Sequence, residues 1–443
     1  MQTNFSLAQL ADPHIVEADK ILRACVHCGF CTATCPTYVL LGDELDSPRG
    51  RIYLIKDMLE NARPATEEVV KHVDRCLSCL SCMTTCPSGV HYMHLVDHAR
   101  DHIEQTYRRP FFDRLNRALL AAVLPYRNRF RLALLGAAIA KPLAPLFDAV
   151  KPLRPLAAML RLAPGLPHGP SHSTQPGVFP AQGPRHKRVA LLGGCAQPVL
   201  RPDIDEAAMR LLNRFGVEVV RTKGEGCCGS LVHHMGREEQ ALALARTNVD
   251  AWTAEIEGEG LDAILMTVSG CGTTIKDYGY MLRLDPAYAA KAEKVSALAM
   301  DISQFAATLH LPAAMAPMEH RVAYHAACSL QHGQKIKGPP VQMLRHVGFE
   351  VAEPFESHIC CGSAGTYNML QSELAGQLRD RKVANIEKLA PQIIATGNIG
   401  CMTQIGSGTD IPVVHTVELL DWATGGPVPL PLARAGIGAA QAA

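Results

Sequence analysis

Aromatic side chains and excess charge are both scarce in this chain of 443 residues. Phe, Trp and Tyr make up 5% of the sequence, and 43 basic residues nearly balance 42 acidic ones, for a formal net charge of +1. Aromatic residues this sparse do not build a platform on which bases stack. A balanced charge gives no overall field that would attract nucleic acid. We therefore expect no nucleic-acid partner.

Long hydrophobic runs are also missing. The longest apolar stretch, LALLGAAIA at 132–140, is about half of the roughly 18–20 residues that a bilayer span needs. The N-terminus has Asp12 and Pro13 where a signal peptide needs an apolar core. We expect no transmembrane segment and a cytoplasmic protein. A peripheral place on the cytoplasmic face of the inner membrane stays open, because the Leu-, Ala- and Arg-rich segment 111–165 suits either an amphipathic surface helix or packing on a neighbouring domain.

Nucleotide-binding signatures are a third absence. We find neither a dinucleotide-binding fingerprint nor a P-loop, and we therefore predict no flavin or nicotinamide site. No general base can be named that would take a proton from an organic substrate. By itself the chain is not expected to oxidise one, and we assign it no catalytic residue.

Cysteine, in contrast, is abundant and strictly patterned, since all sixteen belong to two duplicated patterns. The first, C-x2-C-x2-C-x3-C-P, occurs twice and is typical of two-cluster ferredoxins, in which the last cysteine of each run ligates the other cluster. We therefore predict two [4Fe–4S] clusters, one held by Cys25, Cys28, Cys31 and Cys86 and the other by Cys76, Cys79, Cys82 and Cys35. Zinc sites usually combine two C-x2-C pairs at longer separation, so iron–sulfur is favoured over zinc.

Two arginines, Arg49 and Arg51, lie in the SPRGR sequence between the two runs. Their charges suit contact with a cluster or with a carboxylate of a partner. An exposed basic turn is the alternative interpretation of the same residues.

The second cysteine pattern is a single cysteine, a Cys-Cys-Gly triplet that begins 32 residues later, and a final cysteine. Its two copies are Cys195, Cys227, Cys228 and Cys271, and Cys328, Cys360, Cys361 and Cys401. Adjacent cysteines suit thiolates that bridge metals, and Gly229 and Gly362 allow a positive φ. The copies are candidates for a third and a fourth site, with iron–sulfur, zinc and a metal-free redox site all open. We do not assign the nearby histidines, His233, His234, His325, His332 and His358, as ligands.

The fold class predicted from these patterns is α+β multidomain. Residues 1–110 form a helical two-cluster ferredoxin-type domain, and residues 111–187 form a helical, then Pro/Gly-rich, linker region. Residues 188–318 (lobe 1) and 319–443 (lobe 2) form two similar α/β lobes, because RVALLGGC at 188–195 aligns with RVAYHAAC at 321–328 and strand candidates alternate with helices in both. The single cysteines should lie at the C-terminal edges of the parallel strands.

The lobes resemble the cysteine-rich CCG domain found in heterodisulfide reductases and in several iron–sulfur subunits of respiratory dehydrogenases. In that family the pattern ends in C-x-x-C, whereas this sequence has Thr274 and Gln404 at the last position. The unusual cluster and the disulfide-cleaving chemistry of that family are therefore less favoured. Four thiolates in each lobe still suffice for a [4Fe–4S] cluster or for zinc.

From LRACVHCGFCTATCPTY through SPRGRIYLIK to CCGSAGTY and NIGC, the sequence resembles the iron–sulfur subunits of bacterial glycolate oxidases. The resemblance implies an electron-transfer subunit of a glycolate (2-hydroxy acid) oxidase or dehydrogenase complex. It would take electrons from FAD-containing partner subunits and relay them toward the quinone pool or another membrane-associated acceptor. The alternatives are a thiol–disulfide reductase that uses the CCG lobes, and an iron–sulfur subunit of a lactate or glycerol-3-phosphate dehydrogenase.

Overall fold

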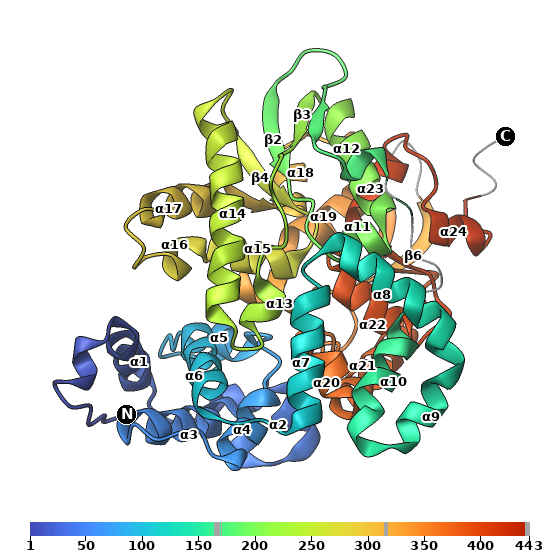
Figure 1. The fold of residues 1–443 in the computed structure, drawn as a ribbon. Coiled ribbons are helices and arrows are strands. Elements are labelled where there is room, and N and C mark those ends of the chain that lie inside the picture. The colour runs from blue at the N-terminus through green and yellow to red at the C-terminus, as the bar shows by residue number, and fades with distance from the viewer. Residues whose placement is uncertain (164–168, 170, 314–317, 439–443) are drawn as a thin grey trace.

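The computed structural model describes residues 1–163, 169, 171–313 and 318–438, and its N-terminal part is helical (Figure 1). Asp12, Ser47 and Thr66 each accept a hydrogen bond from a backbone N–H in the first turn of the helix that follows, which fixes three of the helix starts. Apolar faces of these helices meet in one buried core. The helices are α1 (Pro13–Ala24), α2 (Pro36–Leu41), α3 (Pro48–Glu60), α4 (Glu67–Asp74), α5 (Ser81–Thr85) and α6 (Tyr92–Thr106).

Four further helices, drawn in teal in Figure 1, follow this domain in the chain, and α8, α9 and α10 lie at the lower right of the view. They are α7 (Phe111–Val123), α8 (Arg127–Ala140), α9 (Ala144–Ala149) and α10 (Arg154–Leu162). Pro142 and Pro145 lie in the first turns of the short helical segments that follow α8, where proline is tolerated. The helical stretch therefore continues well past residue 140.

This continuation corrects the expectation that no segment is long enough to span a membrane. The stretch Arg127–Ala149 is long and apolar enough to cross a bilayer by length and composition, although a single such stretch is weak evidence for a span. The uninterrupted apolar run within this stretch covers only residues 132–140. Only 11% of the most apolar part of the stretch is buried, so it lies on the surface and not in a core.

Lobe 1 is a sheet with the strand order β1-β3-β2-β4-β5, in which all neighbours except β1 and β3 are parallel. Its strands are β1 (Gly177–Phe179), β2 (Lys187–Leu191), β3 (Val217–Arg221), β4 (Ala263–Met266) and β5 (Ala299–Asp301). Its helices are α11 (Gln197–Leu200), α12 (Pro202–Arg214), α13 (Ser230–His233), α14 (Glu238–Glu257), α15 (Ser269–Lys276), α16 (Tyr278–Met281), α17 (Ala289–Leu298) and α18 (Ile302–Ala306).

Lobe 2 repeats this order without the antiparallel edge strand, as β7-β6-β8-β9, and all its neighbours are parallel. Its strands are β6 (Met318–Tyr324), β7 (Phe349–Ala352), β8 (Ile393–Thr396) and β9 (Val413–His415). Its helices are the π-helical turn η7 (Ser329–Gly333), α19 (Gly338–His346), α20 (Tyr367–Leu370), α21 (Ser372–Glu387), α22 (Ile399–Gly406), α23 (Thr416–Ala423) and α24 (Leu430–Arg434). The predicted fold class is confirmed.

The two lobes share one hydrophobic core. Buried side chains of lobe 1, such as Leu191 and Leu265, belong to the same cluster as Tyr324, Ile393 and Val414 of lobe 2. The lobes therefore face one another across packed apolar side chains, as the duplication predicts.

The predicted domain limits are not tested, but the positions of several elements can be compared with them. Strand β1 lies inside the predicted linker region 111–187 and pairs with β3 of lobe 1, from Gly177 opposite Arg221 to Phe179 opposite Val219. Residues 164–168 and 170 of that region, 314–317 of lobe 1, and 439–443 of lobe 2 lie outside the described residues.

Candidate metal centres and the pocket between the lobes

The four cysteines predicted for the first cluster surround one small cavity. About 30 Å³ in volume, it is lined by Cys25, Cys28, Cys31 and Cys86, with Cys82 beside them. Cys25 caps the C-terminus of α1, and Gly29 turns the loop with a φ of +86°. The loop remains near the surface, because Cys28 is exposed and the neighbouring Val26 and Phe30 are 66% and 65% exposed.

The set predicted for the second cluster surrounds another cavity, of about 20 Å³. Cys35, Cys76, Cys79 and Cys82 line it. Two residues of this loop other than glycine, Ser78 and Leu80, have positive φ angles of +48° and +61°, an uncommon conformation that wraps the chain around the cavity. Cys35 and Cys86, the last residues of the two runs, each lie with the other run, which is the arrangement that the ferredoxin spacing predicts.

These sets are chemically suited to hold iron–sulfur clusters. All sixteen cysteines of the chain are free, so no disulfide occupies them. Burial, and next the neighbouring Cys328, raise the pKa of Cys79 well above its usual value. Closely packed buried thiols lose their protons readily only when a cation compensates the charge, and iron supplies that compensation.

Both arginines of the SPRGR sequence lie against the ferredoxin-type sets. Arg51 is 1% exposed, and its guanidinium lies 3.8 Å from Cys35 Sγ and 3.3 Å from Asp46 Oδ1. Arg49 pairs with Glu44 and reaches the carbonyl of His27 at 3.5 Å. An exposed basic turn at this place is thus wrong for Arg51, whose buried charge lies beside Cys35 and would offset the negative charge of a thiolate there.

In each lobe the four cysteines form a chain of neighbouring thiols. Cys328 Sγ and Cys360 Sγ are 3.7 Å apart, Cys361 follows Cys360 in the chain, and the sulfur atoms of Cys361 and Cys401 lie within 4.8 Å of one another. The same chain runs in lobe 1 through Cys195, Cys227, Cys228 and Cys271. Each single cysteine follows the C-terminal end of a parallel strand, as predicted.

The Cys-Cys-Gly triplets turn as the sequence predicts, with φ angles of +87° at Gly229 and +90° at Gly362. Residues 224–229, GEGCCG, also have the G-x-G-x-x-G glycine spacing of the dinucleotide-binding fingerprint, although no such site was predicted. This loop leads into α13, a helix of only four residues, and its middle positions are the two paired cysteines. It therefore lacks the long helix on whose N-terminus a dinucleotide pyrophosphate binds.

The residues that replace the last cysteine of the CCG pattern are engaged elsewhere. Gln404 donates to the carbonyl of Ala375 at 3.0 Å and accepts from Asn368 at 3.0 Å. Thr274 donates to the carbonyl of Gly270 at 3.4 Å. Both are buried, so neither side chain is available as a replacement ligand in this arrangement.

The second ferredoxin-type set lies directly against lobe 2. Cys79 belongs to the same buried hydrophobic cluster as Cys360, and Cys328 packs against that cluster. Leu77 and Tyr367 complete the contact from the two sides. Nearby, Thr84 of the N-terminal domain and His332 of lobe 2 share a hydrogen bond of 2.7 Å between Oγ1 and Nδ1.

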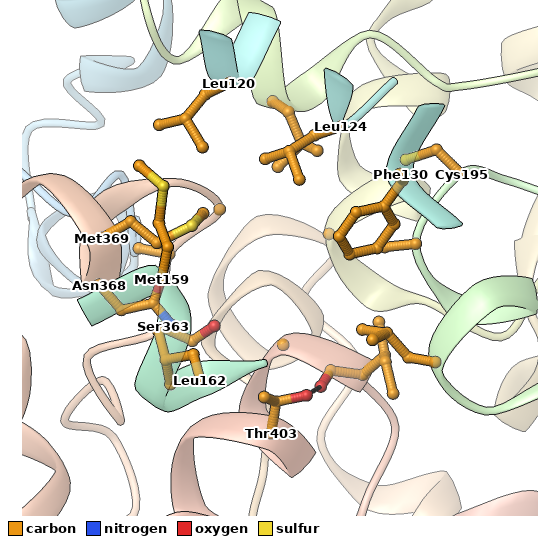
Figure 2. A pocket seen from close by; sticks show the side chains of 18 of the residues that line it. Leu120, Leu124, Phe130, Met159, Leu162, Cys195, Ser363, Asn368, Met369 and Thr403 are labelled. Atoms are coloured by element: carbon orange, nitrogen blue, oxygen red, sulfur yellow. Dashed lines mark hydrogen bonds between the residues drawn. The ribbon is translucent and has the colours of Figure 1, made fainter. Parts of the chain in front are cut away.

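A large apolar pocket lies where lobes 1 and 2 meet helices α7, α8 and α10. Its volume is about 540 Å³, and it reaches seven cysteines of the two lobe sets: Cys195, Cys228, Cys271, Cys328, Cys360, Cys361 and Cys401. Figure 2 shows Leu120, Leu124, Phe130 and Met159 around the space, with the polar side chains of Ser363, Asn368 and Thr403 along one side. No pattern in the sequence predicts this pocket, because its walls come from four separate segments.

The histidines near the lobe sets differ in their surroundings. His332 uses both ring nitrogens, and the carbonyl of His358 accepts from Nε2 at 3.2 Å. His233 and His234 lie near Asp97, at 3.9 Å each. His325 is different, because it lies within 4.8 Å of the sulfur atoms of Cys361 and Cys401. Sequence reasoning missed it, although one signal existed: the matching position of lobe 1 is Leu192.

Comparison with known protein families agrees with these sites. Residues 21–90 match the 4Fe-4S dicluster domain, and residues 189–276 and 322–406 each match the cysteine-rich domain called CCG. The fold and the cysteine sets thus define an iron–sulfur protein that combines a dicluster ferredoxin-type domain with a duplicated cysteine-rich domain.

Similarity to individual curated proteins identifies the family within this class of iron–sulfur proteins. The chain is 43% identical to the glycolate oxidase iron-sulfur subunit of Escherichia coli (strain K12) over 96% of its length and 99% of the relative. It is 31% identical to the probable glycolate oxidase iron-sulfur subunit of Bacillus subtilis (strain 168), over 91% of the chain and 94% of the relative. A lactate utilization protein A from Bacillus licheniformis is 26% identical over 53% of the chain and 99% of the relative. The chain therefore belongs to the family of glycolate oxidase iron–sulfur subunits.

Proposed function

We propose that this chain is the electron-transfer subunit of a glycolate (2-hydroxy acid) oxidase complex. In this role it takes electrons from an FAD-containing partner subunit and passes them toward the membrane quinone pool. The full-length similarity to the Escherichia coli subunit favours glycolate, since the lactate utilization protein covers 53% of the chain. Two [4Fe–4S] clusters, when bound to the ferredoxin-type sets, supply one-electron carriers that let a two-electron flavin reoxidise in steps.

The observation that carries this proposal is the order of the cysteine sets in space. The first set is near the surface, the second lies behind it, and Cys79 of the second contacts the thiol set of lobe 2 in a buried cluster. Burial of Cys79 and Cys360 excludes water from this contact. The arrangement supports a relay that runs from the surface through the second set into lobe 2.

The entry side of the relay is the loop of the first set. Exposed Cys28, Val26 and Phe30 form a small apolar rim there, and such a rim suits a transient protein contact. Arg49, which is about one-third exposed, and its partner Glu44 add an ion pair beside it. We assign this rim to the flavoprotein partner.

The exit side is the pocket of about 540 Å³, which we assign to a lipid-soluble quinone. Its walls are mostly apolar, a few polar groups lie along one side, and it reaches the thiol sets of both lobes. That composition is typical of a small-molecule site. The polar side chains of Ser363 and Asn368 are placed to orient a quinone carbonyl.

The helices over this pocket support a peripheral membrane location. Leu132, Ile139 and Leu146 are 68%, 83% and 64% exposed. Residues 108–161 contain eleven basic and two acidic residues, whereas the whole chain has a net charge of +1. Exposed basic side chains in this segment include Arg108, Arg114, Arg129, Lys141, Arg154 and Arg161. Exposed apolar side chains beside basic ones favour an anionic bilayer surface, here the cytoplasmic face of the inner membrane.

A tryptophan in the pocket tests the exit side. Leu124→Trp should fill part of the pocket and lower the rate of reduction of a short-chain quinone by the complex about tenfold, while reduction of an artificial water-soluble dye that takes electrons from exposed centres stays unchanged. The control is Leu132→Trp, which adds the same side chain at an exposed position of the neighbouring helix. Equal quinone reduction by the two variants would contradict the assignment.

A further inference from the structure

The two lobes hold the same four thiols but differ in one buried side chain beside them. In the alignment of residues 188–195 with 321–328, Leu192 of lobe 1 occupies the position equivalent to His325 of lobe 2. Both positions are buried, at 4% and 1% exposure. Leu192 packs in the hydrophobic core of its lobe, as expected of an apolar side chain.

The ring of His325 has no hydrogen-bond partner. Neither Nδ1 nor Nε2 contacts a donor or an acceptor in the described part of the chain, whereas the backbone N–H of this residue donates to the carbonyl of Ala395 at 2.8 Å. A buried polar group without a hydrogen-bond partner destabilises the folded state. A buried imidazole without partners thus requires an explanation that a leucine at the matching position does not.

The ring faces the end of the thiol chain. One of its nitrogens and the sulfur atoms of Cys361 and Cys401 all lie within 4.8 Å of one another. Neutral imidazole is the form that ligates metals.

We infer that His325 is a ligand of an iron–sulfur centre in lobe 2, together with the thiolates of Cys328, Cys360, Cys361 and Cys401. It stands in for the last cysteine of the CCG pattern, whose position Gln404 occupies without being free to bind. Among the described residues of lobe 1, no histidine forms such a group with two of its thiols, so the two lobes differ in ligand type. This inference rests on the proposed function only in assuming that the lobes carry electrons.

Histidine ligation has a direct electronic consequence. A neutral imidazole in place of the fifth thiolate of the CCG pattern leaves a centre with one negative charge fewer and raises its reduction potential. The centre of lobe 2 should therefore lie at a higher potential than the same centre with a thiolate as its fifth ligand. Because lobe 2 contacts Cys79, such a centre would draw electrons out of the ferredoxin-type domain.

The test is pulsed EPR of the full chain, purified without oxygen and poised at stepped potentials, with natural-abundance and ¹⁵N-histidine-labelled protein. We expect one centre beyond the two ferredoxin-type clusters to show a nitrogen coupling that changes with the label. A spectrum without histidine nitrogen coupling, or a lobe 2 that contains zinc or no metal, would overturn the inference. This measurement uses the unaltered protein, so it does not depend on a variant that folds.

Variants extend the test to the residue. His325→Leu copies lobe 1 and should abolish the nitrogen coupling, whereas His325→Cys should keep the iron of lobe 2 and shift its potential downward. The control is His332→Gln, a neighbouring buried histidine whose two nitrogens are already hydrogen-bonded, which should leave coupling and potential unchanged. Coupling that persists in His325→Leu would overturn the inference. Loss of quinone reduction alone would bear on the proposed function and not on this ligand.

Discussion

Lobes 1 and 2 have the same strand order and the same chain of four thiols, yet they contact the ferredoxin-type domain in different ways. Lobe 2 meets it through an apolar contact that contains Cys79 and Cys360. Lobe 1 meets it through polar pairs, such as His94 with Asp277 at 2.9 Å. A duplicated fold thus determines where thiols gather, whereas the neighbouring domain makes the surroundings of the two copies different.

The largest expected effect is a difference in acceptor reduction when the same cysteine is replaced in lobe 2 or in lobe 1. Cys360→Ser removes a ligand from the lobe that contacts Cys79, and reduction of the physiological acceptor by the complex should fall about 100-fold or more. Cys227→Ser makes the same change in lobe 1, and the loss should be about tenfold or less. Steady-state acceptor reduction with the flavoprotein partner measures both, and iron content checks that the other sets remain loaded. Equal losses would show that the two lobes are not ordered along the relay.

A smaller effect compares the two triplet glycines. A Cβ at Gly362 would lie 2.5 Å from the carbonyl oxygen of Ala375, and one at Gly229 would lie 3.0 Å from that of Ala241. Both glycines have positive φ angles, which cost other residues about 1–2 kcal/mol. We expect both alanine variants to melt at lower temperature, and Gly362→Ala more so than Gly229→Ala. Gly376→Ala, in the open on α21, is the control and should not lower the melting temperature.

The smallest effect concerns the polar contact between the ferredoxin-type domain and lobe 1, where Asp101 of α6 is influenced by Glu238 of α14. Burial, and next the charge of Glu238, raise the pKa of Asp101 from its usual 3.8 to about 6. The folded state therefore binds this proton more tightly, and the associated stability is complete below about pH 4 and is lost as the pH rises through 6. Asp101→Asn should be more stable than the parent by about 1 kcal/mol above pH 6, a value reduced for solvent screening, and no more stable below pH 4.

Thermal melts between pH 4 and 8 check this prediction. Asp380→Asn, at an exposed carboxylate of lobe 2, is the matched control and should leave the pH dependence unchanged. A pH-independent difference between Asp101→Asn and the parent would mean that the carboxylate is not strained by its surroundings.

Cysteine spacing predicted much of the fold and of the sites, for a physical reason. Three cysteines at two-residue spacing can meet only around one small centre, and the duplicated run supplies the fourth ligand, so the ferredoxin-type sets follow from the chain itself. The duplicated strands, such as the matched Val189 and Val322, were equally visible because hydrophobic strands repeat at fixed offsets from the cysteines. The assignment of individual cysteines to individual clusters remains a prediction.

The features that escaped prediction all arise from tertiary contacts. From the sequence alone Arg51 could equally lie on the surface, and only the packing of α3 and α4 shows that it is buried. His325 differs from the other histidines only in the structure, where its ring has no hydrogen-bond partner. The pocket exists only because helices far apart in sequence enclose it. The length of the Arg127–Ala149 helical stretch was missed because prolines at the start of a helical turn do not end a helix.

The hydrophobic core that the lobes share has a consequence for how the protein is made. Lobe 1 leaves the ribosome first, with the half of that core that contains Leu191 and Leu265 still facing water. It can bury this surface only after strands β6, β8 and β9 have been synthesised. Cys228 and Cys361 are each 2% exposed or less once the halves meet, but the pocket between the lobes still reaches both of them. We therefore expect iron that arrives after closure to enter the lobes through this pocket.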